Sequence, residues 1–297
     1  MINSKLNATE AVGFEIYHFP HDHSRNREMA EKYLKMGFMN ISHSLKIDSD
    51  FTRVIADEGV KFWVYANDVG LYSENQGDKL IYGIRDGWKE KIAKKVQDIK
   101  DAGLWDAVLG FDWDEPMLQS TNEIITPVAQ EYAKYGKRQR AIFSYYELIE
   151  GSHPKSSDPE FGKEGHLINA DSCKYFTDIG FDWYGCTDYD RHKFVSNEMK
   201  RRVGRDDVYI WYLPCTWSGK NIFSEKHCLD HLEMCYKLLN EEKNPGGLSC
   251  YNWFSFCPKG AGLDWQLSEK NMSRWDKLEA RMIEIGNELI NKQLNKL

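Results

Sequence analysis

The chain has no long uninterrupted hydrophobic run and no excess of positive charge. No apolar stretch approaches the roughly 18 residues that a membrane-spanning helix needs, and residues Met1–Asn7 lack the hydrophobic core of a signal peptide. We therefore expect a cytoplasmic protein with no membrane partner, or a secreted one if a leader has been removed. The net charge of -7 argues against a nucleic-acid partner, because phosphate backbones bind basic surfaces.

The chain also lacks a Cys-x-x-Cys pair and an internal linker rich in proline or serine. Its seven cysteines, an odd number, all fall between Cys173 and Cys257. This pattern favours buried free thiols in a reducing compartment over a disulfide framework or a zinc knuckle. The missing linker predicts one catalytic domain over residues 1–297.

Apolar residues make up 41% of the chain and aromatic residues 13%, which is enough for a large core. Short β-branched or aromatic runs alternate with amphipathic helical stretches, as repeated strand–helix units require. Eight strands are expected, at Val12–Phe19, Phe38–Ser42, Lys61–Ala66, Asp106–Phe111, Arg140–Tyr145, Phe181–Cys186, Val208–Leu213 and Leu248–Phe256. This pattern predicts a single (β/α)8 TIM barrel, a fold that typically takes about 250 residues. The alternative, a doubly wound open sheet, lacks its Gly-x-Gly-x-x-Gly turn after the first strand.

Helical spacing is clearest in Asn26–Met36 and Lys89–Ala102, and a last helix is expected near Met272–Ile290. Glycines before the next strand are expected to end helices in the left-handed conformation, at Gly37, Gly59, Gly103 and Gly180. Two long connections follow strands, Asn67–Asp86 and Leu148–Leu167. We expect both at the active-site face, because the loops after barrel strands carry function.

One stretch, Val108–Pro116, runs from an apolar strand straight into three carboxylates, Asp112, Asp114 and Glu115. Crowded acids at the end of a buried strand are costly unless they have a function there. Ligands of barrels and of open α/β sheets bind at this end of the strands. The segment is therefore the expected catalytic centre, and Glu115 is the first candidate for a catalytic group.

Glycoside cleavage usually needs one carboxylic acid to protonate the leaving oxygen and a second acid group on the anomeric side. Side chains of neighbouring residues diverge, so Asp114 and Glu115 are poorly placed to flank one bond. They suit a substrate-assisted reaction better, in which the sugar's own 2-acetamido oxygen attacks the anomeric carbon. Asp114 would orient that amide and Glu115 would donate the proton, with a pKa raised by like charge and desolvation.

The triplet Asp114–Pro116 at the end of a fourth barrel strand resembles the Asp-Glu pair of substrate-assisted N-acetylhexosaminidases of glycoside hydrolase family 123 and, more distantly, family 20. The stretch Gly110–Asp114 is similar to the acidic strand-four motif of family 18, whose final Glu stands two residues after the last Asp. Thr187–Asp190 resembles the Tyr-Asp element of that family, which binds the acetamido group. Trp253 sits where these families often place the tryptophan floor of the sugar pocket. The resemblance implies a retaining glycosidase that acts on an oligosaccharide or glycoconjugate.

Polar and aromatic residues at the other strand ends are expected to bind the substrate. With the supporting acid they are Asp112, Tyr65, Asn67, Tyr145, Asp188, Tyr189, Trp211 and Trp253. No cofactor and no metal are expected. His18, His21 and His23 cluster after the first strand, but the fifth and sixth strands lack the histidines that a metal-dependent barrel of the amidohydrolase kind would need.

Several alternatives stay open at the level of the sequence. The acids could cap the next helix. A glycosidase of non-acetylated sugars, retaining or inverting, could pair Glu115 with a carboxylate from another strand, such as Glu147 or Asp188. The barrel could also bind carbohydrate without catalysis. The retaining clan with Asn-Glu-Pro on strand four is disfavoured, because Val208–Pro214 has no Glu to serve as its nucleophile. Glu15, inside the first strand, needs a buried partner and has a structural role in this interpretation.

Overall fold

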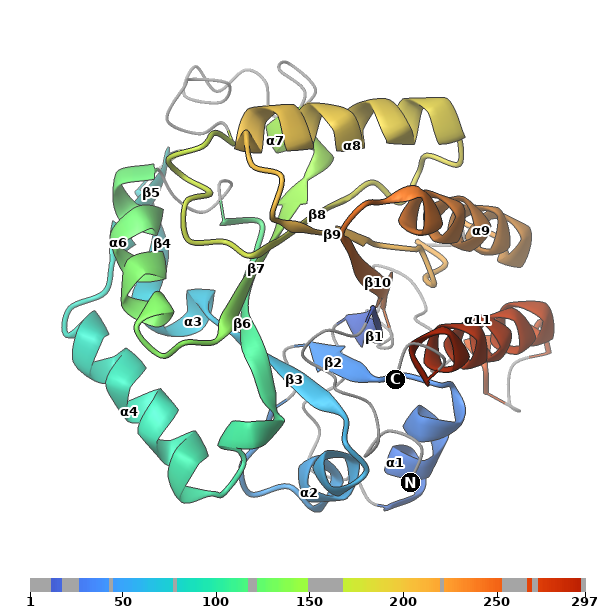
Figure 1. Cartoon of the computed structure of the whole chain (residues 1–297), viewed down its shortest axis with the longest axis horizontal. Helices are drawn as coiled ribbons and strands as arrows, with labels where there is room; N and C mark the ends of the chain where they lie inside the picture. The colour runs from blue at the N-terminus through green and yellow to red at the C-terminus, as the bar shows by residue number, and fades with distance from the viewer. Residues whose placement is uncertain are drawn as a thin grey trace.

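Eight parallel strands close into a barrel in the computed structural model of the chain (Figure 1). The structure describes residues 12–17, 27–42, 45–76, 79–116, 122–148, 168–219, 222–252, 266–268 and 272–294. The barrel strands are β1 (Gly13–Tyr17), β2 (Asn40–Ser42), β3 (Lys61–Tyr65), β6 (Val108–Asp114), β7 (Arg138–Ser144), β8 (Asp178–Asp182), β9 (Tyr209–Tyr212) and β10 (Pro245–Tyr251). Each pairs with the next along the chain, and β1 pairs with β10 to close the ring. The predicted (β/α)8 barrel is confirmed.

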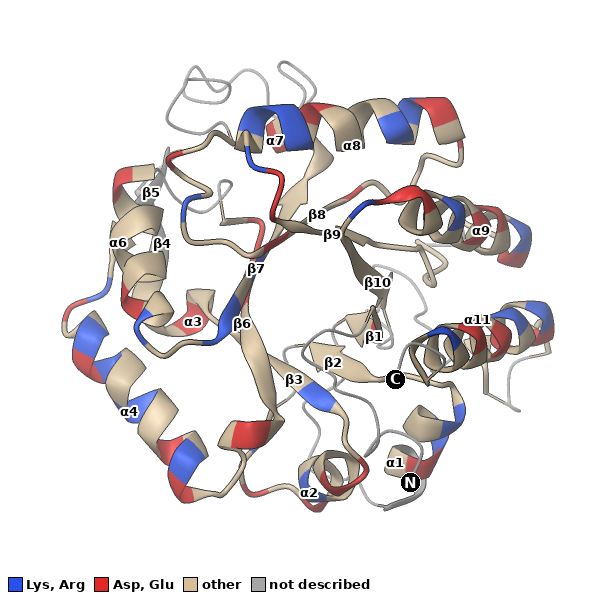
Figure 2. Cartoon of the chain, viewed as in Figure 1, with Lys and Arg blue, Asp and Glu red and all other residues tan. Residues whose placement is uncertain are grey.

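Helices surround the strands and bury their apolar faces against the outer side of the barrel (Figure 1). They are α1 (Arg27–Lys35), α2 (Asp50–Asp57), α3 (Asn67–Gly70), α4 (Trp88–Asp101), α6 (Asn122–Ala133), α7 (Tyr145–Leu148), α8 (Tyr189–Val203), α9 (Glu225–Glu241) and α11 (Asp276–Leu294), with a 3-10 turn η2 (Trp105–Ala107). Lysine, arginine and acidic residues alternate along the outer helices, as expected of solvated faces (Figure 2). No helix among the described residues is long and apolar enough to cross a membrane.

Two sequence-based expectations about the connections need revision. The stretch Asn67–Asp86 is not a structureless loop, because α3 and an antiparallel hairpin, β4 (Leu71–Gln76) with β5 (Lys79–Ile84), lie within it. Gly180 does not end a helix: it lies within β8, where a Cβ would stand 2.8 Å from the carbonyl oxygen of Trp211. Gly37, Gly59 and Gly103 do have positive φ angles, as expected. The connection after Leu148 lies outside the described residues.

The strand limits also shift in ways that matter for the site. The fourth barrel strand, β6, begins at Val108 and continues to Asp114, so two of the three acids lie within the strand. The sixth, β8, ends at Asp182, although the sequence pattern placed its start at Phe181. The six described cysteines are all buried free thiols, as the sequence indicated.

Side chains that point into the barrel form three layers along its axis. The layer at the amino ends of the strands holds Trp211, whose indole nitrogen donates to Asp178 at 2.8 Å. The middle layer holds Arg140 with Glu15 and Asp112. The third layer, at the carboxyl ends, contains Tyr17 and Asp114. Tyr17 lies two residues after Glu15 on β1, and Asp114 lies two residues after Asp112 on β6. Residues two apart on a strand point to the same face, so both side chains also point into the barrel.

Candidate active site

Asp114 is held in a fixed orientation at the carboxyl end of β6. The hydroxyl of Tyr17, from β1, donates to its Oδ1 atom at 2.7 Å. Asn67, at the start of α3, donates from Nδ2 to the carbonyl oxygen of Asp114 at 2.8 Å and accepts its backbone N–H at 3.3 Å. A hydroxyl donor stabilises the ionised form of a carboxylate. The structure therefore brings together Asp114 and Asn67, and it adds Tyr17, which the sequence pattern did not single out.

Glu115 follows Asp114 with a backbone conformation that few residues other than glycine adopt. Its φ angle is 42°, in the left-handed region that costs a non-glycine residue about 1 kcal/mol or more. The backbone N–H of Glu115 donates to the carbonyl oxygen of Ile142 at 2.8 Å, which fixes the turn against β7. The turn ends the strict alternation of the strand, so that Glu115 faces the same group of acids as Asp114.

The pKa of Glu115 is raised to about 8, first by burial, then by the negative charges of Asp182 and Asp114. The side chain of Ser144 contacts Glu115 and opposes this rise. A carboxylic acid that keeps its proton near neutral pH can donate it to a leaving group. Glu115 therefore meets the electrostatic requirement of a general acid.

Asp182 is a third acid at this position, and the sequence pattern did not single it out. It ends β8 opposite Ser144 of β7, and burial raises its pKa to about 7, followed by the charge of Asp114. The sequence did contain a signal, since Asp182 follows the apolar stretch 179–181. However, the aromatic residues Trp183 and Tyr184 follow Asp182 directly. They made the predicted strand start and end later in the chain than β8 does.

Aromatic side chains stand beside the three acids. Tyr184 stacks on Tyr251, with ring centroids 4.6 Å apart, and Tyr17 lies 6.3 Å from Tyr251. Trp217 meets Tyr251 edge to face at 5.8 Å. Flat aromatic faces next to polar groups suit contact with the C–H faces of a sugar ring.

A buried ionic layer lies directly beneath the acids. Both oxygens of Asp112 accept from Arg140, at 2.9 and 2.7 Å, and Glu15 lies 2.8 Å from the same guanidinium. Asp112 is fully buried, so the expectation that it contacts substrate is wrong. Glu15 also accepts from Ser42 and Ser249, which fits the structural role inferred from its position in the strand.

Other predicted substrate-binding residues lie away from the acids. Asp188 caps α8 by accepting the backbone N–H of Arg191 at 3.0 Å. Tyr189 turns toward α9, where its hydroxyl donates to Glu241 at 2.5 Å. These two expectations are corrected, because β8 ends earlier than the sequence suggested and the segment carrying both residues begins a helix.

Tyr145 stacks on Trp183 at 4.8 Å, and Trp183 in turn stacks on His192 between the helices and the barrel. Trp211 is fully buried in the layer at the opposite end of the barrel, so its expected contact with substrate is also corrected. Glu147 is buried and accepts the backbone N–H of Ser144 at 2.5 Å, which makes it a cap of α7.

Tyr65 ends β3 opposite Asp112 in the strand register. Its carbonyl oxygen accepts from Lys95 of α4 at 2.6 Å. Trp253 and the histidines His18, His21 and His23 lie outside the described residues.

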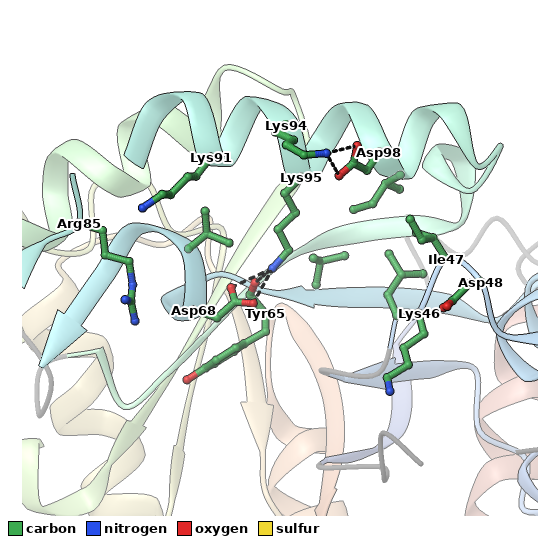
Figure 3. Close-up of a pocket in the computed structure, with 14 residues that line it drawn as sticks. Lys46, Ile47, Asp48, Tyr65, Asp68, Arg85, Lys91, Lys94, Lys95 and Asp98 are labelled. Atoms are coloured by element: carbon green, nitrogen blue, oxygen red, sulfur yellow. Dashed lines mark hydrogen bonds and ion pairs between the residues drawn. The ribbon is translucent and has the colours of Figure 1, made fainter. Parts of the chain in front are cut away.

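A pocket of about 750 Å³ opens on the outer side of the barrel, between α4 and the segment 45–48 (Figure 3). Tyr65 lines it, but Asp114, Glu115 and Asp182 do not. Two of its lysines are paired, Lys95 with Asp68 at 2.9 Å and Lys94 with Asp98 at 2.7 Å. We therefore do not place the reaction in this pocket.

His192, His231 and Cys235 form a second buried cluster, and their ligand atoms lie within 4.8 Å of one another. The cluster lies between α8, α9 and the outer face of the barrel, apart from the acids. The Nδ1 atom of His231 accepts the backbone N–H of Cys215 at 2.8 Å. A neutral imidazole that accepts at Nδ1 keeps its proton on Nε2. His231 therefore offers no free lone pair, and we assign no metal to the cluster.

Comparison with known proteins gives structural neighbours only. No protein-family model matches the sequence, and no curated protein matches it. A β-glucuronidase of Bacteroides uniformis is similar with a TM-score of 0.56 and 11% identity, over 85% of this chain and 32% of that chain. A β-glucuronidase of Ruminococcus gnavus has a TM-score of 0.51 and 12% identity, over 93% of this chain and 50% of that chain. A GH113 β-1,4-mannanase has a TM-score of 0.56 and 11% identity, over 94% and 99% of the two chains.

The shared feature is the (β/α)8 barrel. This chain spans 32% and 50% of the lengths of the two β-glucuronidases, whereas it spans nearly the whole mannanase. At this level of identity the likeness concerns the fold, and the residues at the ends of the strands must carry any functional argument.

Proposed function

We propose that this protein is a glycoside hydrolase that cleaves N-acetylhexosaminides with retention, by a substrate-assisted mechanism. The supporting observation is the unequal environment of two neighbouring acids. Tyr17 donates to Asp114 and favours its ionised form, whereas burial and like charge keep a proton on Glu115. Such a division assigns the acid role to Glu115 and leaves Asp114 ionised. The glycosidase fold of the structural neighbours agrees with this proposal.

In the first step, Glu115 donates its proton to the glycosidic oxygen while the 2-acetamido oxygen attacks the anomeric carbon. The bond to the leaving group breaks, and the sugar becomes a cyclic oxazolinium ion whose N–H is oriented and stabilised by Asp114. In the second step, the Glu115 carboxylate takes a proton from water, and the water oxygen attacks the anomeric carbon. The ring opens, the acetamido group is restored, and Glu115 is again protonated.

The test compares two variants with a matched control on aryl N-acetylhexosaminides. Glu115→Gln and Asp114→Asn should each lower kcat by a factor of at least about 100, as loss of an acid/base group does. Asp188→Asn removes a negative charge from an exposed helix cap and should leave turnover unchanged. Near-native turnover by both site variants would show that the assignment is wrong. A thiazoline mimic of the cyclised sugar should inhibit the wild-type protein.

A second candidate function keeps Glu115 as the acid and uses a carboxylate from another strand, on a sugar without an acetamido group. Asp182 is the observation that favours it, since this acid reaches the site from β8. Aryl glycosides with and without the 2-acetamido group distinguish the two functions. The primary proposal predicts turnover of the acetylated substrates alone.

A further inference from the structure

Three acids from two strands meet at the carboxyl end of the barrel, although the proposed reaction uses only two of them. Asp114 and Glu115 come from β6 and its end, and Asp182 comes from β8. Strand β7 separates the two, and in the register Asp114 pairs with Ile142 and Asp182 pairs with Ser144. Ser144, the last residue of β7, therefore stands between Glu115 and Asp182.

The side chain of Ser144 contacts both acids. A serine hydroxyl has one proton to donate and two lone pairs that accept, so it cannot donate fully to two carboxylates at once. If Glu115 is protonated, it donates to the Ser144 oxygen, and the Ser144 hydroxyl donates to Asp182. The opposite arrangement, with the proton on Asp182 and the charge on Glu115, satisfies both contacts equally well. Ser144 therefore requires one proton between the two acids, and their other contacts decide which acid carries it.

The remaining contacts of Asp182 also favour its ionised form. Its carboxylate accepts from the hydroxyl of Tyr184 and from its own backbone N–H, in addition to Ser144. Hydrogen bonds to a carboxylate stabilise the charge. Among the described residues, the other titratable groups that act on Glu115 or its neighbours are Asp114, Tyr17, Tyr184 and Tyr251. From the layer beneath, Asp112 and Arg140 also act on Tyr17.

We infer that Asp182, whose carboxylate lies across Ser144 from Glu115, keeps the proton on Glu115 by its negative charge and is thus a positioning residue of the proposed reaction. The inference rests on the proposed function, in which Glu115 is the acid. It differs from the second candidate function, in which Asp182 itself would attack the sugar or activate water.

The variant Asp182→Asn removes the charge but keeps the shape and an acceptor for Ser144. Without the negative neighbour, the pKa of Glu115 falls from about 8, while burial still holds it above the usual value. The alkaline limb of kcat/KM, which reports the acid of the free enzyme, should move down by about one pH unit. Near pH 5, turnover should stay within about tenfold of the wild-type value, because Glu115 is then protonated in both proteins.

The variant Ser144→Ala provides a test in the opposite direction. It keeps the charge of Asp182 and removes a contact that lowers the pKa of Glu115. The alkaline limb of kcat/KM should therefore stay at the same pH or move to higher pH. Asp188→Asn, on the same connection after β8, is the charge-matched control and should not move the limb. An unshifted limb in Asp182→Asn, or a downward shift in Ser144→Ala, would overturn the inference.

A direct readout separates this inference from the proposed function. The carboxyl carbon of Glu115 can be followed by NMR in isotopically labelled protein, with Glu115→Gln used for assignment. Its titration midpoint should be lower in Asp182→Asn than in the wild-type protein, whether or not any glycoside is cleaved. Complete loss of activity at every pH, restored by azide with formation of a glycosyl azide, would instead make Asp182 a nucleophile. Failure of the wild-type protein to turn over any glycoside refutes the proposed function alone.

Discussion

The variant Arg140→Met tests whether the buried ionic layer supports the acids above it. Arg140 is fully buried and makes charge-assisted hydrogen bonds to Asp112 at 2.9 and 2.7 Å. Its guanidinium lies 2.8 Å from Glu15 and is sandwiched between the indoles of Trp63 and Trp211, 4.6 and 4.4 Å from the ring centroids. Methionine fills much of the same space without the charge.

Removal of one partner from a buried ion pair typically costs about 3–5 kcal/mol, because the other charge stays buried without compensation. Two carboxylates lose their cation here, so we expect a loss of about 4 kcal/mol in the free energy of unfolding near neutral pH. Burial already raises the pKa of Glu15, and Arg140 opposes that rise. The variant should therefore have a still higher Glu15 pKa in the folded protein than in the unfolded chain.

A raised pKa in the folded state means that the native protein binds more protons than the unfolded chain does. Stability then falls as the pH rises from the unfolded value of about 4 through the folded value. The defect of Arg140→Met should accordingly be smaller at pH 5 than at pH 8. The reverse order would contradict the assignment of Glu15 and Asp112 as its charged partners.

Urea denaturation followed by tryptophan fluorescence at the two pH values measures these differences. Arg281→Met is the control, since Arg281 pairs with Glu233, Glu284 and Glu288 on the surface. Surface ion pairs contribute about 0–1 kcal/mol, so this variant should change little at either pH. A loss below about 1 kcal/mol for Arg140→Met, equal to that of the control, would refute the proposed role of the layer.

Two further predictions concern stability. Gly110→Ala places a Cβ 2.4 Å from the carbonyl oxygen of Arg138 and 2.5 Å from Trp63, and it should destabilise the protein by about 1–3 kcal/mol. Gly185→Ala, which meets nothing within 4 Å, is its control in thermal denaturation. Glu115→Gln should make the protein more stable than the wild type at pH 9, by on the order of 4 kcal/mol at about 1.4 kcal/mol per pKa unit, because the raised pKa of Glu115 costs stability as the pH rises. That difference should vanish near pH 4, and a gain that is constant with pH would contradict the pKa assignment.

Much of the fold could be predicted from the sequence because each strand–helix unit carries its own local pattern. The strands are apolar runs of limited length, and glycines such as Gly37 and Gly59 mark helix ends by their positive φ angles. Boundaries were less accurate where apolar character continues past a strand. Trp183 and Tyr184 follow β8 and pack against other aromatic rings, so the sequence pattern alone could not place the end of that strand at Asp182.

The candidate site was predictable only where its residues are neighbours in the sequence. Asp114 and Glu115 belong to one segment, and their crowding is visible in the printed chain. Asp182 joins them through strand register, which a single sequence does not reveal. Trp211 was expected at the site and lies elsewhere for the same reason. Strand register pairs it with Gly180 and Gly247, and this pairing decides in which layer of the barrel its inward-facing side chain lies.

Adjacency of Asp114 and Glu115 raises a physical problem, since consecutive strand residues point to opposite faces. The structure resolves it by ending the strand at Asp114 and giving Glu115 a φ of 42°. Both acids then belong to one charge cluster, yet one accepts from Tyr17 and the other is desolvated. A glycine at position 115 would adopt this turn at lower cost but could not donate a proton. The strained backbone is therefore best explained by a requirement for a carboxyl group at that point, which is what an acid catalyst needs.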